Sequence, residues 1–159
     1  NHKYKDSFVL PNSKVDESVM IIPGTDGQKM SKSYNNIINI FLPEKELRKQ
    51  IMSIQTDSLA LEESKNPEIC NVFNIYKLLS SSKDSDILAQ KYRAGNYGYG
   101  HAKQELLELI CSKFSTEREN YNLFMQDTSI IETELLEGAK KASLIANRVL
   151  SRVRKNIGY

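Results

Sequence analysis

The sequence predicts a mainly helical protein whose first 42 residues differ from the rest. From Pro43 onward, apolar residues recur every three or four positions, which is the period of a helix with one buried face. Before Pro43, the apolar residues stand in short runs separated by glycine-containing turns, a pattern typical of strands and loops. The 159 residues are 40% hydrophobic and 26% charged with a net charge of +2, a composition typical of a globular chain rather than a disordered one.

The strand-like and loop-like pattern occupies residues 19–42. The apolar run 19–22 is followed by Pro23 and Gly24, so we expect a buried strand that ends in a turn. Gly24 and Gly27 flank a polar turn and can adopt backbone angles closed to other residues, so we expect this loop to be able to move. Residues 37–42 are mostly apolar again and form either a short strand or a loop packed on the core.

A series of helices is expected after this segment. Pro43 suits the first position of a helix, and Asn66 followed by Pro67 is a second start signal. A shorter helix is expected over residues 84–93 and a long one over 102–125, separated by a glycine-rich break. The positions expected to face the core are Leu47, Ile51, Ile54, Ile69, Val72, Phe73, Tyr76, Leu79, Leu106, Leu107, Ile110, Phe114, Tyr121 and Phe124.

The last helix carries start and stop signals of its own. Ser129 and Glu132 have the spacing of a capping box, in which each side chain bonds the other residue's main-chain N–H. Gly158 is suited to end the helix. The expected core face is Leu135, Ala139, Ala142, Ile145, Ala146, Val149 and Val153.

The cysteines and histidines do not predict a metal site. Cys70 and Cys111 are isolated in the sequence, and neither His2 nor His101 has a cysteine or a second histidine nearby. We therefore expect two reduced thiols and no metal. The chain has no apolar run of the ~18 residues that a membrane helix needs, and its start does not show the pattern of a signal peptide.

The residues that carry the chemistry are Lys29, Met30, Ser31, Lys32 and Ser33. They place two ammonium groups three positions apart, with two hydroxyls beside them, on a glycine-flanked loop. Cations and hydroxyls in this pattern suit a triphosphate, because negative charge grows on the pyrophosphate side as the α-phosphate is attacked. The alternative is a solvated loop that happens to be rich in lysine and serine.

This pentapeptide resembles the second signature of class I aminoacyl-tRNA synthetases, and residues 23–36 as a whole resemble the loop of the bacterial tryptophanyl-tRNA synthetase family. Tyrosyl-tRNA synthetases share the pentapeptide, but their C-terminal sequence does not usually resemble that of this chain. Further stretches resemble the tryptophanyl family in the same order, namely residues 47–53, 56–58, 71–76, 92–100 and 137–142.

The resemblance implies a fold and a division into domains. Residues 1–42 would be the C-terminal edge of a class I nucleotide-binding, Rossmann-like α/β domain, and residues 43–159 a helical tRNA-binding domain on the anticodon side. Residues 29–33 would bind ATP, and Lys29 and Lys32 would contact its pyrophosphate moiety during catalysis. The implied reaction joins tryptophan to its tRNA through a tryptophanyl-adenylate. The implied setting is a cytoplasmic homodimer that uses ATP accompanied by Mg²⁺ and holds no structural metal.

One part of the family pattern is not found before Lys29. Class I synthetases carry an H-x-G-H-like signature upstream of the loop that corresponds to residues 23–36, called here the lysine–serine loop. His101 stands after that loop, in a helical stretch. We therefore expect this chain, which starts at Asn1, to be the C-terminal half of the enzyme and inactive alone. The alternatives are a non-catalytic tRNA-binding fragment or paralogue, and an unrelated helical protein with a phosphate-binding loop.

The C-terminal tail offers a second candidate site. Residues 129–159 contain six basic and three acidic residues. Lys141, Arg148, Arg152 and Lys155 fall within about 60° of one another on a helix and can follow the phosphates of a tRNA. The alternative is a solvated helix face. In the glycine-rich stretch before it, Tyr97 and Tyr99 are expected to cover the core, with stacking on a base as the alternative.

Overall fold

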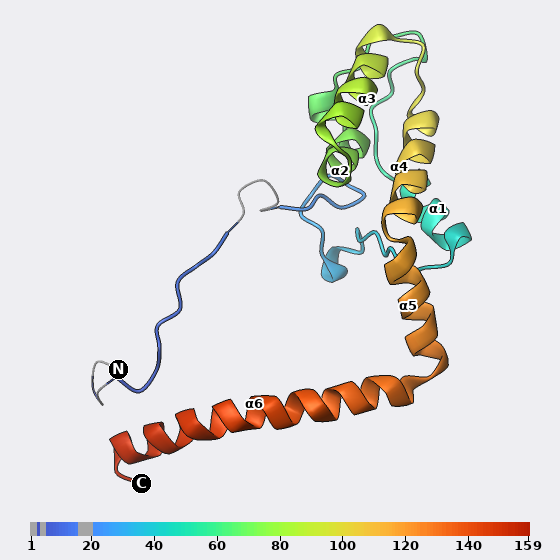
Figure 1. Ribbon diagram of the computed structural model, residues 1–159. Helices are drawn as coiled ribbons and strands as arrows, with labels where there is room; N and C mark the ends of the chain where they lie inside the picture. Colours follow the sequence, from blue (N-terminus) through green and yellow to red (C-terminus); the bar gives the residue numbers. More distant parts are fainter. Residues whose placement is uncertain (1–2, 4–5, 16–20) are drawn as a thin grey trace. The chain divides into compact units, whose positions relative to one another are not determined.

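A computed structural model describes residues 3, 6–15 and 21–159 of the chain. The chain divides into two compact units, residues 16–119 and residues 1–15 with 120–159. Within the described residues, the helices and short 3-10 helices are η2 (Lys32–Tyr34), α1 (Glu44–Met52), η3 (Pro67–Ile69), α2 (Asn71–Leu79), α3 (Ser82–Ala94), α4 (Tyr99–Lys113), α5 (Ser115–Gln126) and α6 (Thr128–Ile157) (Figure 1). The mainly helical class predicted from the sequence is confirmed.

The expected buried strand is not seen among the described residues. Val19 and Met20 lie outside them, and Ile21 and Ile22 are 58% and 50% exposed and belong to no strand. The carbonyl of Ile22 accepts one hydrogen bond, from the N–H of Met30 at 2.8 Å, and the bridge next to it, between Pro23 and Lys29, is isolated. The described segment therefore offers Ile21 and Ile22 no neighbouring strand on which to pair, and the prediction of a strand here is wrong for these two residues.

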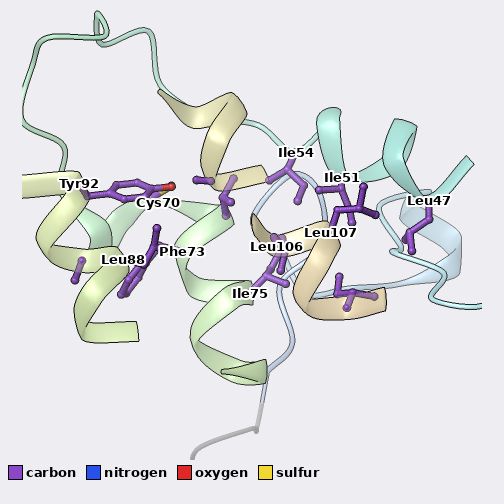
Figure 2. Close-up of a cluster of buried hydrophobic side chains, with 14 residues drawn as sticks. Leu47, Ile51, Ile54, Cys70, Phe73, Ile75, Leu88, Tyr92, Leu106 and Leu107 are labelled. Carbon is purple, nitrogen blue, oxygen red and sulfur yellow. The ribbon is translucent and has the colours of Figure 1, made fainter. Parts of the chain in front are cut away.

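Helices α1 to α4 form the core of the larger unit. Helix α4 packs against both α1 and α2, and α3 packs against α2. Figure 2 shows apolar side chains from all four helices meeting between them. The fully buried side chains include Leu47, Ile51, Ile54, Val72, Leu88, Tyr92, Leu106, Leu107 and Ile110. This cluster confirms most of the expected core positions before residue 111 and gives the larger unit its stability.

Local capping explains where the helices of this unit begin. Asn66 accepts from the main-chain N–H of Glu68, but it opens only η3, and α2 begins at Asn71. Ile69 belongs to η3 and is 72% exposed, so it is not a core residue as expected. Ser81 accepts from the main-chain N–H of Asp84 at 3.2 Å, and α3 therefore begins earlier than the predicted residue 84.

The long helix expected over residues 102–125 is interrupted. Phe114 has φ −108° and ψ 22°, outside the helical range, and separates α4 from α5. Its side chain is half-buried against the core of the larger unit. A break of one residue leaves the spacing of the apolar residues almost unchanged, so the sequence pattern did not indicate it.

In the smaller unit, α6 begins at a different cap from the predicted one. Asp127 is the N-cap, and its Oδ1 atom accepts both from the main-chain N–H of Ser129 at 3.0 Å and from its hydroxyl at 2.6 Å. Because Ser129 is already inside the first turn, the predicted capping box is wrong. Gly158 ends the helix with φ +94°, as predicted.

The expected core face of α6 is not buried among the described residues. No residue of this helix is buried, and Leu135 and Ile145 are 64% and 67% exposed. The last turns of α6 do contact the N-terminal segment of the same unit. Arg152 donates to the carbonyl oxygen of Ser7 at 2.9 and 3.1 Å, and the side-chain amide of Asn156 donates to the Ser7 hydroxyl at 2.8 Å.

Within the described parts of the chain, no helix combines the length and the apolar composition needed to cross a membrane.

Candidate functional site: the lysine–serine loop

The segment that carries the lysine–serine pentapeptide is a closed turn. The main-chain N–H of Gly24 donates to the carbonyl of Gln28 at 2.7 Å, and that of Gly27 donates back to Gly24 at 3.0 Å. After the turn, the N–H of Met30 donates to the carbonyl of Ile22 at 2.8 Å. These bonds give the loop a defined conformation although only one isolated bridge forms within it.

Both glycines of this turn lie where a side chain would collide with a neighbour. A Cβ atom on Gly24 would lie 2.5 Å from atoms of Asn36, and one on Gly27 would collide with the side chain of Asn71 on α2. Gly27 also has φ +78°, a conformation that favours glycine. The N–H of Gln55 donates to the carbonyl of Thr25 at 2.8 Å. The turn is therefore seated directly against the helical part of the larger unit.

Asn36 lies at the centre of the loop and is only 2% exposed. Its Oδ1 atom accepts from the N–H of Ser31 at 2.8 Å. Its Nδ2 atom donates to Oδ1 of Asp26 at 2.8 Å and to the carbonyl of Lys29 at 3.2 Å. Its own carbonyl accepts from the N–H of Thr25 at 2.9 Å. One side chain thus bonds both arms of the loop.

Asp26 completes this arrangement from the turn. Its Oδ1 atom also accepts from the main-chain N–H of Gln28 at 3.0 Å. The hydrogen bond from Asn36 favours the charged carboxylate and holds the pKa of Asp26 below its ordinary value. Sequence reasoning did not single out Asp26 or Asn36, because a pair ten positions apart in an irregular loop has no periodic signal.

Met30 anchors the middle of the pentapeptide in an apolar cavity of about 330 Å³. The cavity is lined only by apolar side chains, from the loop, from the segment that follows it and from the helices. These are Ile22, Met30, Ile38, Ile40, Ile75, Leu78, Leu79, Ile110 and Phe114. Because Met30 is half-buried here, it holds its neighbours on the surface rather than offering a polar contact of its own.

The two lysines of the pentapeptide, unlike Met30, lie on the surface. Lys29 and Lys32 are exposed, and neither forms an ion pair with any residue that the structure describes. Beside them, the hydroxyls of Ser31 and Ser33 are 2.8 Å apart. Two cations without an ion-pair partner in the described part of the chain and a pair of hydroxyls, on a loop that is hydrogen-bonded to Asn36, are suited to bind a polyphosphate.

The four basic residues predicted on the last helix do not have equal surroundings. Lys141, Arg148 and Lys155 are exposed on α6. Arg152 is also exposed, but its guanidinium donates twice to the carbonyl of Ser7. Three of the four are therefore free of hydrogen bonds to the rest of the described chain, and Arg152 is partly engaged.

The tyrosines of the glycine-rich stretch cover the core, as predicted. The rings of Tyr97 and Tyr99 have their centroids 5.8 and 5.9 Å from that of buried Tyr92. The hydroxyl of Tyr99 donates to Asp57 at 2.7 Å. Burial raises the pKa of both hydroxyls above the ordinary tyrosine value. His101, on α4, lies beside Tyr97 with ring centroids 5.8 Å apart.

The thiols and metal ligands do not form a second site in the described part of the chain. Cys70 is buried, with its sulfur 3.4 Å from the hydroxyl of Tyr92, and Cys111 is half-buried; neither is in a disulfide. Among the residues that the structure describes, no three histidine, cysteine, aspartate or glutamate side chains are grouped as metal ligands.

Comparison with known proteins shows the family of this chain. A profile of the family described as "tRNA synthetases class I (W and Y)" matches residues 1–115. This chain therefore belongs to the class I tRNA synthetases of the tryptophanyl and tyrosyl type.

The individual relatives are tryptophan–tRNA ligases. The chain is 45% identical to that of Fusobacterium nucleatum over 151 residues, which is 95% of this chain and 46% of the relative. It is 44% identical to that of Campylobacter jejuni (strain RM1221) over 158 residues, which is 99% of this chain and 50% of the relative.

A solved structure shows the same likeness. The crystal structure of tryptophanyl-tRNA synthetase from C. jejuni complexed with ADP and tryptophan matches with a TM-score of 0.87 and 43% identity. The match covers 100% of this chain and 50% of that one. The chain thus spans about half the length of the relatives it matches.

Proposed function

We propose that this chain is the ATP-closing and tRNA-facing half of a tryptophan–tRNA ligase. The observation that carries the proposal is the exposed pair Lys29 and Lys32, free of counter-ions among the described residues, on the family's loop. The relatives named as tryptophan–tRNA ligases favour tryptophan over tyrosine as the amino acid. Residues 1–42 would complete the nucleotide-binding domain, and residues 43–159 would form the helical domain on the anticodon side.

In this reaction the loop would stabilise the leaving group, pyrophosphate. A carboxylate oxygen of tryptophan attacks the α-phosphorus of ATP, the bond from that phosphorus to the bridging oxygen breaks, and pyrophosphate leaves with the electron pair. Lys29 and Lys32 offset the charge that grows on pyrophosphate, and the hydroxyls of Ser31 and Ser33 supply directed hydrogen bonds. Met30 contributes by anchoring the loop. Mg²⁺ would accompany ATP, held by its phosphates.

The second half-reaction moves the tryptophanyl group from the adenylate to the 3′ end of the tRNA, with AMP as the leaving group. Exposed Lys141, Arg148 and Lys155 on α6, with Arg152 beside them, would contact the tRNA backbone through charge. The amino-acid pocket would come from the half of the relatives that this chain does not match. We expect the working enzyme to be a cytoplasmic homodimer.

The test is tryptophan-dependent exchange of pyrophosphate into ATP by the complete synthetase in which this chain stands. We expect exchange with tryptophan and none above background with tyrosine, and no exchange by this chain alone. A complete protein that binds tRNA but never forms an adenylate would instead support the alternative, a non-catalytic tRNA-binding protein. Exchange with tyrosine rather than tryptophan would overturn the choice of amino acid.

A further inference from the structure

All the polar atoms of the Asn36 side chain are used inside the lysine–serine loop. Its oxygen accepts from Ser31, and its nitrogen donates to Asp26 and to the carbonyl of Lys29. Among the described residues, none of its hydrogen bonds goes to a helix of the core. Replacing this side chain should therefore change the loop while leaving the helical core as it is.

These bonds fall beside the groups that would contact the phosphates. One bond goes to the main-chain carbonyl of Lys29 itself, and another comes from the main-chain N–H of Ser31, the residue directly before Lys32. The bond to Asp26 joins this arm to the turn that packs on α2. The direction in which both lysines leave the loop therefore depends on one buried amide, which is 2% exposed.

We infer that Asn36 is a positioning residue for adenylate formation, which holds residues 29–33 in the conformation that presents Lys29 and Lys32 to the pyrophosphate group. This inference rests on the proposed function. Asn36 touches no reacting atom in it. Because Asn36 already orders a loop that carries two like charges, the free energy of ordering that loop is not added to the activation barrier. The effect therefore appears in the rate of adenylate formation rather than in the binding of tryptophan.

The bond between Asn36 and Asp26 supplies a specific test. Asn36→Asp keeps the shape and the acceptor for Ser31 but places two carboxylates at a contact of 2.8 Å. Two carboxylates at so short a distance cannot both stay ionised without moving apart. The loss of activity relative to wild type should therefore become smaller as the pH falls and one carboxylate gains a proton. The double variant Asp26→Asn with Asn36→Asp removes one of the two carboxylates and again faces an amide donor with a carboxylate acceptor. Because the oxygen that this replaces also accepts from Gln28, only part of the activity should be recovered.

The experiment measures tryptophan-dependent ATP–pyrophosphate exchange by the complete synthetase. For Asn36→Asp at about pH 8 we expect kcat to fall about tenfold or more with the KM for tryptophan unchanged. We expect the ratio to wild type to improve at about pH 6, and the double variant to exceed the single one by about threefold or more. The matched control is Asn35→Asp, the same charge change on the exposed neighbouring residue, which should stay within about twofold of wild type.

Each outcome decides the matter. If wild type does not catalyse the exchange, the proposed function fails, and the positioning role in adenylate formation fails with it. If wild type is active and Asn36→Asp stays within about twofold of it, or the double variant is no better than the single one, the positioning role is overturned. Thermal unfolding is recorded for every variant. Global unfolding of Asn36→Asp under assay conditions would also overturn the inference, because the inference assigns Asn36 a local effect.

Discussion

The ammonium group of Lys65 lies 2.8 Å from the carbonyl oxygen of Ala60, although this lysine is only 2% exposed. It also donates to the carbonyls of Leu61 at 3.2 Å and Glu63 at 3.0 Å. All three of its N–H groups therefore donate to main-chain oxygens. The buried cation in this way holds together the segment between α1 and η3, to which all three carbonyls belong. The centroid of the Tyr99 ring lies 5.5 Å from the same nitrogen.

We predict that Lys65→Met lowers the free energy of unfolding by about 3 kcal/mol, because three carbonyls lose a charged donor. Chemical denaturation followed by circular dichroism measures the change. The matched control is Lys77→Met, because Lys77 is exposed and its ion pair with Glu68 is long, at 3.9 Å. That control should change stability by less than about 0.5 kcal/mol. Equal effects of the two substitutions would contradict the role given to Lys65.

Lys32→Ala in the complete synthetase should slow adenylate formation by about 100- to 1,000-fold, the effect of losing one donor aimed at the transition state. The measurement is single-turnover adenylate formation at saturating ATP. Lys83→Ala removes another exposed lysine, from α3, and should leave the rate unchanged. A loss of less than about threefold for Lys32→Ala would rule out its catalytic role.

Gly27→Ala should disturb the loop for two reasons: its φ of +78° and the nearby side chain of Asn71. We expect a cost of about 1–3 kcal/mol and slower adenylate formation. A second change, Asn71→Ala, should recover only the steric part. Gly100→Ala is the control, because a Cβ at that position of α4 meets nothing within 4 Å. It should stabilise the helix by about 0.5–1 kcal/mol, so a destabilised Gly100→Ala would undermine the comparison.

The carboxylate of Asp26 should make the loop sensitive to acid. Because hydrogen bonding holds the folded pKa below the ordinary value of 3.8, its contribution to stability is complete above that value and is lost as the pH falls through the folded pKa. A carbon-detected NMR titration of the Asp26 carboxyl should show this lowered pKa in wild type. In Asn36→Ala, which removes the largest cause, the pKa should rise toward the ordinary value; an unchanged pKa would contradict the assignment.

Charge reversal on α6 should weaken tRNA binding without affecting ATP–pyrophosphate exchange. For Lys141→Glu with Arg148→Glu, we expect the salt dependence of tRNA affinity, plotted as log Kd against log salt, to lose about two units of slope. Filter binding over a range of salt concentrations measures it. Lys140→Glu makes one such charge reversal about 100° around the helix and should reduce the slope by much less than one unit. A loss of about one unit, half that of the double variant, would mean that net charge alone matters.

Some features of this protein are local in the sequence and were predicted from it. The helical class follows from the spacing of residues such as Leu47 and Ile51, because a helix repeats every 3.6 residues along the chain itself. The pentapeptide at residues 29–33 indicated the family because its residues are contiguous. The glycine stop at Gly158 was found for the same reason.

Choices between neighbouring local signals required the structure. Asp127 and Ser129 are both good caps two positions apart, and only the folded backbone shows that Asp127 caps α6. Likewise, the break at Phe114 is one residue long and leaves the apolar spacing intact. The amphipathic pattern of α6 predicted a buried face, but a pattern gives the direction of a face and not what covers it.

The tertiary structure alone decided which distant polar groups meet. Asn36 reaches Asp26 and Ser31 at once, and Lys65 meets three carbonyls, because the chain turns back on itself at those points. No periodicity marks such residues, since their partners are set by the path of the backbone. The sequence therefore determined which residues carry the charge of the candidate site, and the fold determined the buried amide that holds them in place.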